Sequence, residues 1–145
     1  LIMLDIDHFK DINNRYGYDQ GDEVLKSLSK LLTDLTRGSD SVFRYGGEEF
    51  CIILRQIKYE SLGLVVERFR EAISELLINN LNEPDVVLKI TASFGAVFFD
   101  GDAFEEDREL PVEEMIEQAD TNLNKSKKLG RNTCSLTRFI SGKSK

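Results

Sequence analysis

Two carboxylates follow the first apolar run of the chain and could bind a metal ion. Asp5 ends the run Leu1–Leu4, which is typical of a strand buried on both faces, and Asp7 follows two residues later on the same face. Carboxylates bind hard cations, and Mg²⁺ prefers one or two protein carboxylates together with the phosphates of a substrate. A helix beginning near His8 would offer a phosphate its free backbone N–H groups and the positive end of its dipole. These features predict metal-dependent phosphoryl or nucleotidyl transfer.

A second pair of carboxylates, Glu48 and Glu49, comes directly after Gly46-Gly47. Strand-like runs lie on both sides of the glycines. Gly-Gly between such runs predicts a β-hairpin, because both central residues of the favoured tight turn need a positive φ. Successive residues of a strand point to opposite faces, so the two glutamates cannot both point the same way. The spacing alone leaves open which of them faces a site.

Lys127 and Arg131, four residues apart at the end of the last expected helix, could supply the positive charge that a phosphate needs. The chain has no Gly-x4-Gly-Lys sequence, which excludes a P-loop enzyme. Each feature also has a purely structural interpretation. The aspartates could end a strand and cap a helix, the two cations could complement a helix C-terminus, and either glutamate could be a solvated turn residue.

The composition limits the class of protein. The 145 residues are 41% hydrophobic and 31% charged, which is typical of one soluble globular domain. The net charge of −7 argues against a nucleic-acid polymer as a partner bound by charge alone. Cys51 and Cys134 lie in apolar runs and are expected to be buried, reduced thiols. No apolar run approaches the ~20 residues of a membrane span, so we expect a cytoplasmic domain, although the full-length protein could be membrane-anchored.

Hydrophobic periodicity predicts one α/β domain over residues 1–139, followed by a polar tail over 140–145. Asp7 is the expected N-cap of the first helix. In chain order we expect a strand over 1–4, a helix over 8–14, a loop over 15–21, a helix over 22–38, hairpin strands over 40–45 and 49–54, a helix over 59–76, a strand over 86–99, an acidic loop over 101–109, a helix over 111–130 and a strand over 133–139.

Several motifs, in order and at the right spacing, resemble one known family. Gly46-Gly47-Glu48-Glu49-Phe50 is similar to the signature of GGDEF domains, the diguanylate cyclases, in its Gly-Gly-Glu-Glu-Phe variant. The other matching segments are Asp5-Ile6-Asp7-His8-Phe9-Lys10, Ile12-Asn13, Gly21-Asp22, Ser93-Phe94-Gly95, Ala119-Asp120 and Gly130-Arg131-Asn132. The resemblance implies an α/β fold, an α+β sandwich with a central, mostly antiparallel five-stranded sheet flanked by helices. This fold is similar to nucleotidyl cyclase and polymerase palm domains.

The resemblance also implies a reaction. Two GTP molecules, one on each of two facing domains of a homodimer, condense to cyclic di-GMP with release of two pyrophosphates. Asp5 and Glu48 would be catalytic, and Glu48 would help to deprotonate the attacking hydroxyl. The implied ligands of Mg²⁺, or of Mn²⁺, are Asp5, the Ile6 carbonyl, Glu48 and Glu49. The residues implied to bind GTP are Phe9, Lys10, Asn13, Asp22, Gly46, Lys127 and Arg131.

The Asp22 carboxylate is an argument for guanine. It can accept hydrogen bonds from N1–H and the 2-amino group of guanine, and adenine lacks these donors. Arg37 and Asp40 stand in the place of the family's Arg-x-x-Asp inhibitory site, where Arg37 could pair with and stack on the product. The structural alternative is that Arg37 ends a helix and Asp40 starts a loop.

Two other functions stay open. The chain could be a catalytically weak GGDEF domain that serves as a cyclic di-GMP or GTP sensor, or a nucleotidyl cyclase with another base. The family usually carries a helical segment before the first strand, and nothing precedes Leu1 in this sequence. We therefore expect a longer natural protein with an upstream sensor or receiver domain.

Overall fold

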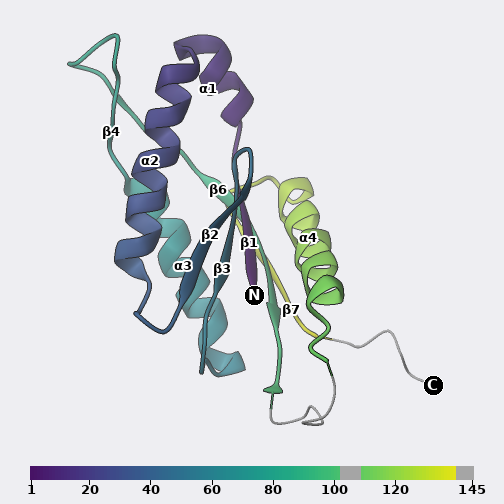
Figure 1. Cartoon of the computed structure of the whole chain (residues 1–145). Helices are drawn as coiled ribbons and strands as arrows, with labels where there is room; N and C mark the ends of the chain where they lie inside the picture. Colours follow the sequence, from purple (N-terminus) through teal and green to yellow (C-terminus); the bar gives the residue numbers. More distant parts are fainter. Residues whose placement is uncertain (102–108, 140–145) are drawn as a thin grey trace.

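A five-stranded sheet forms the centre of the molecule (Figure 1). The structure is a computed structural model that describes residues 1–101 and 109–139. The strands, in their order across the sheet, are β2 (Ser41–Gly46), β3 (Glu49–Ile53), β1 (Ile2–Ile6), β6 (Ala92–Phe98) and β7 (Cys134–Arg138). Neighbouring strands are antiparallel except for β6 and β7, which are parallel. The predicted five-stranded, mostly antiparallel sheet is confirmed.

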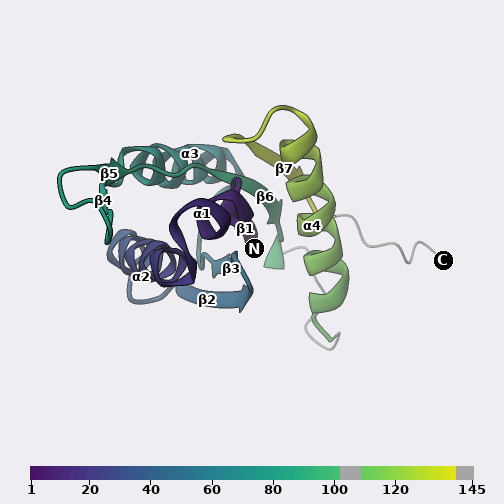
Figure 2. The same ribbon diagram turned by 90° about the horizontal axis from the view of Figure 1, so that it is seen from above.

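Helices cover both faces of the sheet (Figures 1 and 2). On one side lie α1 (Phe9–Tyr16), α2 (Tyr18–Leu35) and α3 (Tyr59–Glu75), and on the other lies α4 (Val112–Lys128). Side chains of β1 alternate between these layers, as a strand requires. Ile2, Leu4 and Ile6 join the large core with α2 and α3, whereas Met3 packs with the α4 residue Leu123. The whole of β1 is buried, as its apolar run predicts.

The α4 helix packs unusually close to β6. A Cβ atom on Gly95 would lie 2.1 Å from the Ala119 carbonyl oxygen and 2.2 Å from the Leu123 nitrogen, so only glycine fits there. Buried hydrogen bonds fix the register of the helix: Asn122 Nδ2 donates to the Ala96 carbonyl at 2.9 Å, and Ser126 Oγ donates to the Phe94 carbonyl at 2.7 Å. The position of α4 along the sheet is therefore set by directed contacts as well as by apolar packing.

The parallel pairing of β6 and β7 determines where α4 ends. A parallel pair needs a crossover connection, and α4 supplies it. The first residue of β6, Ala92, pairs with Ile6 at the end of β1, and Cys134 at the start of β7 pairs with Phe94. The last turn of α4 consequently lies at the same end of the sheet as the C-terminal end of β1. Basic residues of α4 are thereby brought to the end of the first strand.

The predicted loop over 15–21 is wrong. α1 continues to Tyr16 and α2 begins at Tyr18, so that Gly17 alone, with φ 90°, separates the two helices. Gln20 and Gly21 are buried in the first turns of α2. The two glycines at positions 17 and 21 suggested a loop, but one glycine is enough for the turn because it can adopt a positive φ.

The predicted strand over 86–99 is also wrong in part. β5 (Val87–Leu88) pairs with β4 (Ile78–Asn79) in a separate two-stranded sheet, and only β6 joins the central sheet. The side chain of Gln20 holds this small sheet, since its Nε2 donates to the Asn79 carbonyl at 2.9 Å. Alternation of apolar and polar residues continues through both strands, so it could not reveal where the chain leaves one sheet for the other.

Two predictions fall on residues outside the described part of the chain: most of the acidic loop over 101–109 and the polar tail over 140–145. In the part that is described, no helix combines the length and the apolar character needed to cross a bilayer.

Candidate active site

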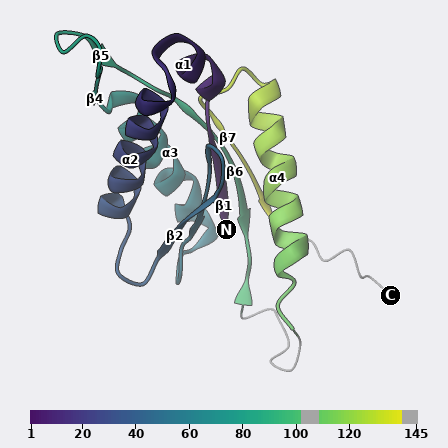
Figure 3. The same ribbon diagram turned by 45° about the horizontal axis from the view of Figure 1, so that its top comes forward.

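The start of α1, the β2–β3 turn and the C-terminal end of α4 meet at one end of the sheet (Figures 1 and 3). Asp5 lies there at the end of β1, with only 8% of its surface exposed. Its direct neighbours in the sheet are Glu49 on β3 and Ser93 on β6. The Glu48 carbonyl accepts a hydrogen bond from the Ile6 N–H at 3.3 Å, which ties the turn to the end of β1.

The tight turn differs from the prediction. Gly46 is the last residue of β2 and pairs with Glu49, so the central turn residues are Gly47 and Glu48 rather than the two glycines. Gly47 alone of these has a positive φ, at 47°. Arg44 Nε donates to the Gly47 carbonyl at 2.9 Å and closes the turn. Glu48 therefore projects from the turn itself, whereas Glu49 belongs to the strand beside Asp5.

Lys127, from the last turn of α4, forms an ion pair with Asp5. Its Nζ lies 2.7 Å from Asp5 Oδ2, and the side chains are 30% and 11% exposed. Burial nevertheless raises the pKa of Asp5, because it outweighs the opposing effect of Lys127, and nearby Glu48 and Asp7 add to the rise. Burial likewise raises the pKa of Glu49, helped by the charges of Asp5 and Asp120. The site therefore carries more negative charge than its one ion pair neutralises.

This donor set fits a hard divalent cation. Carboxylates and a backbone carbonyl are oxygen ligands, and Mg²⁺ commonly takes only one or two protein carboxylates and completes its shell with water and substrate phosphates. Within residues 1–101 and 109–139, no group of three His, Cys, Asp or Glu side chains is arranged to hold a metal ion by protein ligands alone. Asp5, Glu48 and Glu49 supply the carboxylates at this end of the sheet.

The prediction that Asp7 caps α1 is wrong. His8 is the N-cap residue, in a left-handed conformation with φ 56°, and the helix has no side-chain cap. The Asp7 carboxylate turns instead to three donors, namely Thr91 Oγ1 and Ser93 Oγ at 2.7 Å and the Asn132 N–H at 3.0 Å. Asp7 therefore joins β1 to β6 and to the turn after α4.

The uncapped start of α1 leaves the N–H groups of its first turn, including those of Phe9 and Lys10, without an intrahelical partner. This turn follows directly on the end of β1. Backbone donors and the positive end of the helix dipole are therefore beside the carboxylates, as the sequence predicted for a phosphate site.

The turn that carries Arg131 has an uncommon backbone. Gly130, Arg131 and Asn132 all have positive φ angles, at 112°, 64° and 46°. The Arg131 N–H donates to the Ser126 carbonyl at 3.1 Å, which is the long hydrogen bond of a Schellman motif at the end of α4. Arg131 is exposed one turn beyond Lys127. The structure thus brings Lys127, in the last turn of α4, to Asp5, and places Arg131 in the turn that directly follows this helix.

Asn13 and Asp22 lie where α1 packs on α2. Asn13 Oδ1 is buried and has no hydrogen-bond partner within the described part of the chain. A Cβ atom on Gly21 would lie 1.9 Å from that oxygen, so the glycine is what lets the Asn13 side chain sit against α2. Asp22 follows Gly21 and is exposed. Asn13 thus lies against Gly21, the residue that precedes Asp22 in α2.

Arg37 and Asp40 lie on a separate cavity of about 180 Å³. Asp40 Oδ2 accepts from the Arg37 N–H at 3.0 Å and its Oδ1 accepts from the Arg55 N–H at 3.1 Å, so the aspartate shapes the turn before β2. Arg68 from α3 lines the same cavity and donates to the Leu35 carbonyl at 3.1 Å. Sequence reasoning missed Arg68, because nothing in the helical pattern of α3 relates it to Leu35, 33 positions earlier.

Comparison with known proteins decides the family. The family model described as "Diguanylate cyclase, GGDEF domain" matches residues 1–133. The chain belongs to the GGDEF family. The diguanylate cyclase VdcA of Vibrio cholerae is 38% identical over 133 residues, which cover 91% of this chain and 37% of VdcA. The diguanylate cyclase DosC of Escherichia coli is 35% identical over 136 residues, which cover 94% of this chain and 28% of DosC.

Solved GGDEF structures share the fold. The GGDEF domain of DgcB from Caulobacter crescentus, determined in complex with c-di-GMP, matches with a TM-score of 0.77 at 27% identity. The match covers 93% of this chain and 75% of that one. The family predicted from the motifs is thereby confirmed. This GGDEF chain spans well under half the length of the two curated relatives.

Proposed function

We propose that this GGDEF domain is a cytoplasmic diguanylate cyclase that condenses two GTP molecules into cyclic di-GMP and releases two pyrophosphates. One observation carries the proposal: Asp5 and the Glu48 turn meet Lys127 at the end of β1. Carboxylates that bind a divalent cation and cations that bind phosphates are the two parts that nucleotidyl transfer requires. The names of the relatives support the same reaction.

In this proposal Asp5, the Ile6 carbonyl and Glu48 hold Mg²⁺ or Mn²⁺, and Glu49 supplies a further carboxylate. The bound ion would neutralise phosphate charge and favour ionisation of the attacking hydroxyl. Glu48 accepts the proton of the 3′-hydroxyl; it is half-buried in the turn and lies close enough to Asp5 for its charge to help raise the pKa of that residue. Gly46 leaves room for the nucleotide because no atom lies within 4 Å of the position of a Cβ there.

The triphosphate is bound by the backbone N–H groups of Phe9 and Lys10 and by Lys127 and Arg131. Lys127 is paired with Asp5 in the free protein. A cation on Asp5 would take over that charge and release the ammonium group for the phosphates. Asn13 and Asp22 read the guanine edge, which favours GTP over ATP because adenine would leave the Asp22 carboxylate unpaired.

Each domain supplies one GTP, so turnover needs a homodimer in which two sites face each other. The cavity with Arg37 and Asp40 would bind the product cyclic di-GMP and inhibit the enzyme. The guanidinium groups of Arg37 and Arg68 both line this cavity, and a guanidinium group can bind phosphate bidentately and stack on guanine. A sensor or receiver domain elsewhere in a longer protein would control how the two domains meet.

The test is mass spectrometry of products from GTP and Mg²⁺ over a range of protein concentrations. We expect cyclic di-GMP, with a rate that rises more steeply than linearly with protein. Glu48→Gln should lower the rate at least about 100-fold while GTP binding persists, since proton transfer typically contributes that much. Glu117→Gln, on the exposed face of α4, is the matched control.

Two results would overturn the proposal. No dinucleotide from GTP at any protein concentration would exclude the cyclase. If cyclic di-GMP then bound to the wild type and to Glu48→Gln but not to Arg37→Ala, the domain would be a sensor instead. Product made equally well from ATP would identify a different nucleotidyl cyclase.

A further inference from the structure

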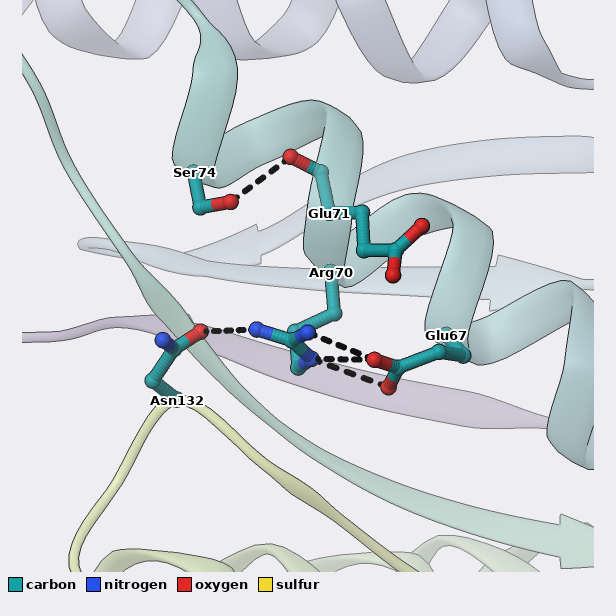
Figure 4. Close-up of polar contacts among 5 residues, drawn as sticks. All are labelled: Glu67, Arg70, Glu71, Ser74 and Asn132. Atoms are coloured by element: carbon teal, nitrogen blue, oxygen red, sulfur yellow. Dashed lines mark hydrogen bonds and ion pairs between the residues drawn. The ribbon is translucent and has the colours of Figure 1, made fainter.

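A contact from α3 reaches the turn that carries Arg131. Arg70 Nη1 donates to Asn132 Oδ1 at 3.0 Å, although the residues are 62 positions apart (Figure 4). α3 lies on the opposite face of the sheet from α4, so this bond joins the two helical layers at the edge of the sheet (Figure 2). None of the sequence motifs that indicate nucleotide chemistry includes Arg70.

The Arg70 guanidinium is held in place by its own helix. Nε donates to both carboxylate oxygens of Glu67, at 3.0 and 2.9 Å, and Nη2 donates to Oε1. The Arg70 side chain is only 20% exposed, and its hydrogen bond lowers the pKa of Glu67. A planar guanidinium held on one edge has its remaining nitrogen aimed in a fixed direction, which here is toward Asn132 (Figure 4).

The turn itself needs external support. Arg131 and Asn132 are non-glycine residues with positive φ, a conformation that is unfavourable for most side chains and persists where neighbouring groups impose it. Three contacts impose it here. Ser126 accepts from the Arg131 N–H, Asp7 accepts from the Asn132 N–H, and Arg70 donates to the Asn132 side chain. The first two come from the site's own strand and helix, and Arg70 is the support from outside it.

We propose that Arg70 is a positioning residue for GTP binding: through Asn132 it holds the left-handed turn that presents Arg131 to the triphosphate. Arg70 does not touch the nucleotide in this scheme. The inference rests on the proposed function, in which Arg131 binds phosphate. Loss of the Arg70–Asn132 bond should let the turn relax, so that Arg131 is no longer held where the phosphates lie and ground-state binding weakens.

The experiment compares variants that break the bond from either side. Arg70→Met removes the donor. Asn132→Gly removes the acceptor but keeps the backbone N–H for Asp7 and tolerates the positive φ. Both should raise the KM for GTP about tenfold with little change in kcat, as expected for a lost interaction common to ground and transition state. Because only the first variant changes charge, equal effects would assign the loss to geometry.

Ser74→Ala on the same helix is the matched control, since the Ser74 hydroxyl donates to the Glu71 carbonyl of its own turn (Figure 4). It should leave KM unchanged. The decisive comparison uses Arg131→Met, in which Arg70→Met should add no further rise in KM because Arg70 acts through Arg131. Affinity for a non-hydrolysable GTP analogue, measured by calorimetry, should fall by the same factor in the single variants.

Three outcomes would overturn the inference while the wild type remains active. They are an unchanged KM in Arg70→Met, a full additional effect of Arg70→Met in the Arg131→Met background, and a lowered unfolding temperature with unchanged GTP affinity. The last would make Arg70 a structural residue only. A wild-type chain that binds GTP normally but makes no cyclic di-GMP would overturn the proposed function and not the role of Arg70 in binding.

Discussion

The ammonium nitrogen of Lys127 lies 2.7 Å from Asp5 Oδ2, and these two residues are 122 positions apart in the chain. Each is the other's only ion-pair partner within residues 1–101 and 109–139. In the proposed function these two charges act separately, Asp5 on the metal ion and Lys127 on the phosphates, whereas the free protein pairs them. Burial still raises the pKa of Asp5 in spite of Lys127, so the ionised carboxylate is less favourable in the fold than in water.

Asp5→Asn should abolish product formation without destabilising the free domain. With its pKa raised above 3.8, Asp5 binds more protons in the folded state than in the unfolded state, so its ionisation lowers stability as pH rises through that window. At pH 7 the neutral side chain of Asp5→Asn removes the unfavourable burial of an ionised carboxylate. Thermal unfolding and product mass spectrometry check both parts. Mg²⁺ with GTP should raise the unfolding temperature of the wild type and not that of the variant.

Asp7→Asn should give the opposite result. The Asp7 carboxylate is buried and accepts from three donors, and an amide has one acceptor atom in place of two. Loss of these charge-assisted bonds should lower the free energy of unfolding by about 2 kcal/mol. Urea denaturation measures the change. A variant as stable as the wild type would show that the network around Asp7 does not support the fold.

Gly95→Ala should displace α4. The added methyl group would meet backbone atoms of Ala119 and Leu123, which cannot move aside as a side chain can. Overpacking of this kind costs about 1–3 kcal/mol and here also shifts Lys127 away from Asp5. We expect a lower urea midpoint together with a lower kcat. Gly63→Ala is the control, because the position of a Cβ on Gly63 is open space.

Gly21→Ala should impair recognition of the base. A Cβ at this position would lie 1.9 Å from Asn13 Oδ1, so the Asn13 side chain must leave its place against α2. If Asn13 contacts guanine, the KM for GTP should rise roughly tenfold while the unfolding temperature hardly falls, since alanine favours a helix more than glycine does. Steady-state kinetics with GTP would contradict the role of Asn13 if KM did not change.

The two cysteines should be unreactive in the folded domain. Both are free thiols, but only Cys51 is fully buried as predicted, and Cys134 is half-buried; desolvation raises the pKa of Cys51 and raises that of Cys134 to about 12. Alkylation at pH 8 should therefore be slow until urea is added. Stability should fall at alkaline pH. Above pH 9.0 the unfolded chain loses thiol protons that the folded chain keeps, so the free energy of unfolding falls. Cys134→Ala should lessen that fall in alkaline urea titrations, and rapid labelling of the native protein would contradict the burial.

Ordered motifs were sufficient for the family, and the resemblance implied the five-stranded sheet; apolar runs located its strands, except that the run over 86–99 is divided between two sheets. Local signals failed where one residue decided the geometry. Gly17 alone replaced a predicted loop, and the hairpin turned at Gly47-Glu48 because a register shift between Arg44 and Gly46 moves the pairing by one residue.

The sequence suggested which residues form the candidate site, but it did not reveal their contacts. That Asp7 would leave α1 uncapped and bind Thr91 and Ser93 depends on the antiparallel pairing of β1 with β6. Arg70 was not predictable at all, since its partner Asn132 comes from a different layer of the fold. Such pairings arise from tertiary packing, which no spacing along the chain encodes.

The central position of β1 has a kinetic consequence. The first strand of the chain pairs on one side with β3 and on the other with β6, so its two neighbours are synthesised roughly 45 and 90 residues after it. Long-range pairings of this kind close late and slow folding. Asp5 therefore acquires its surroundings only when nearly the whole domain has assembled. Partly folded chains should be unable to bind nucleotide, and GTP binding in refolding experiments should appear together with the last phase of sheet formation.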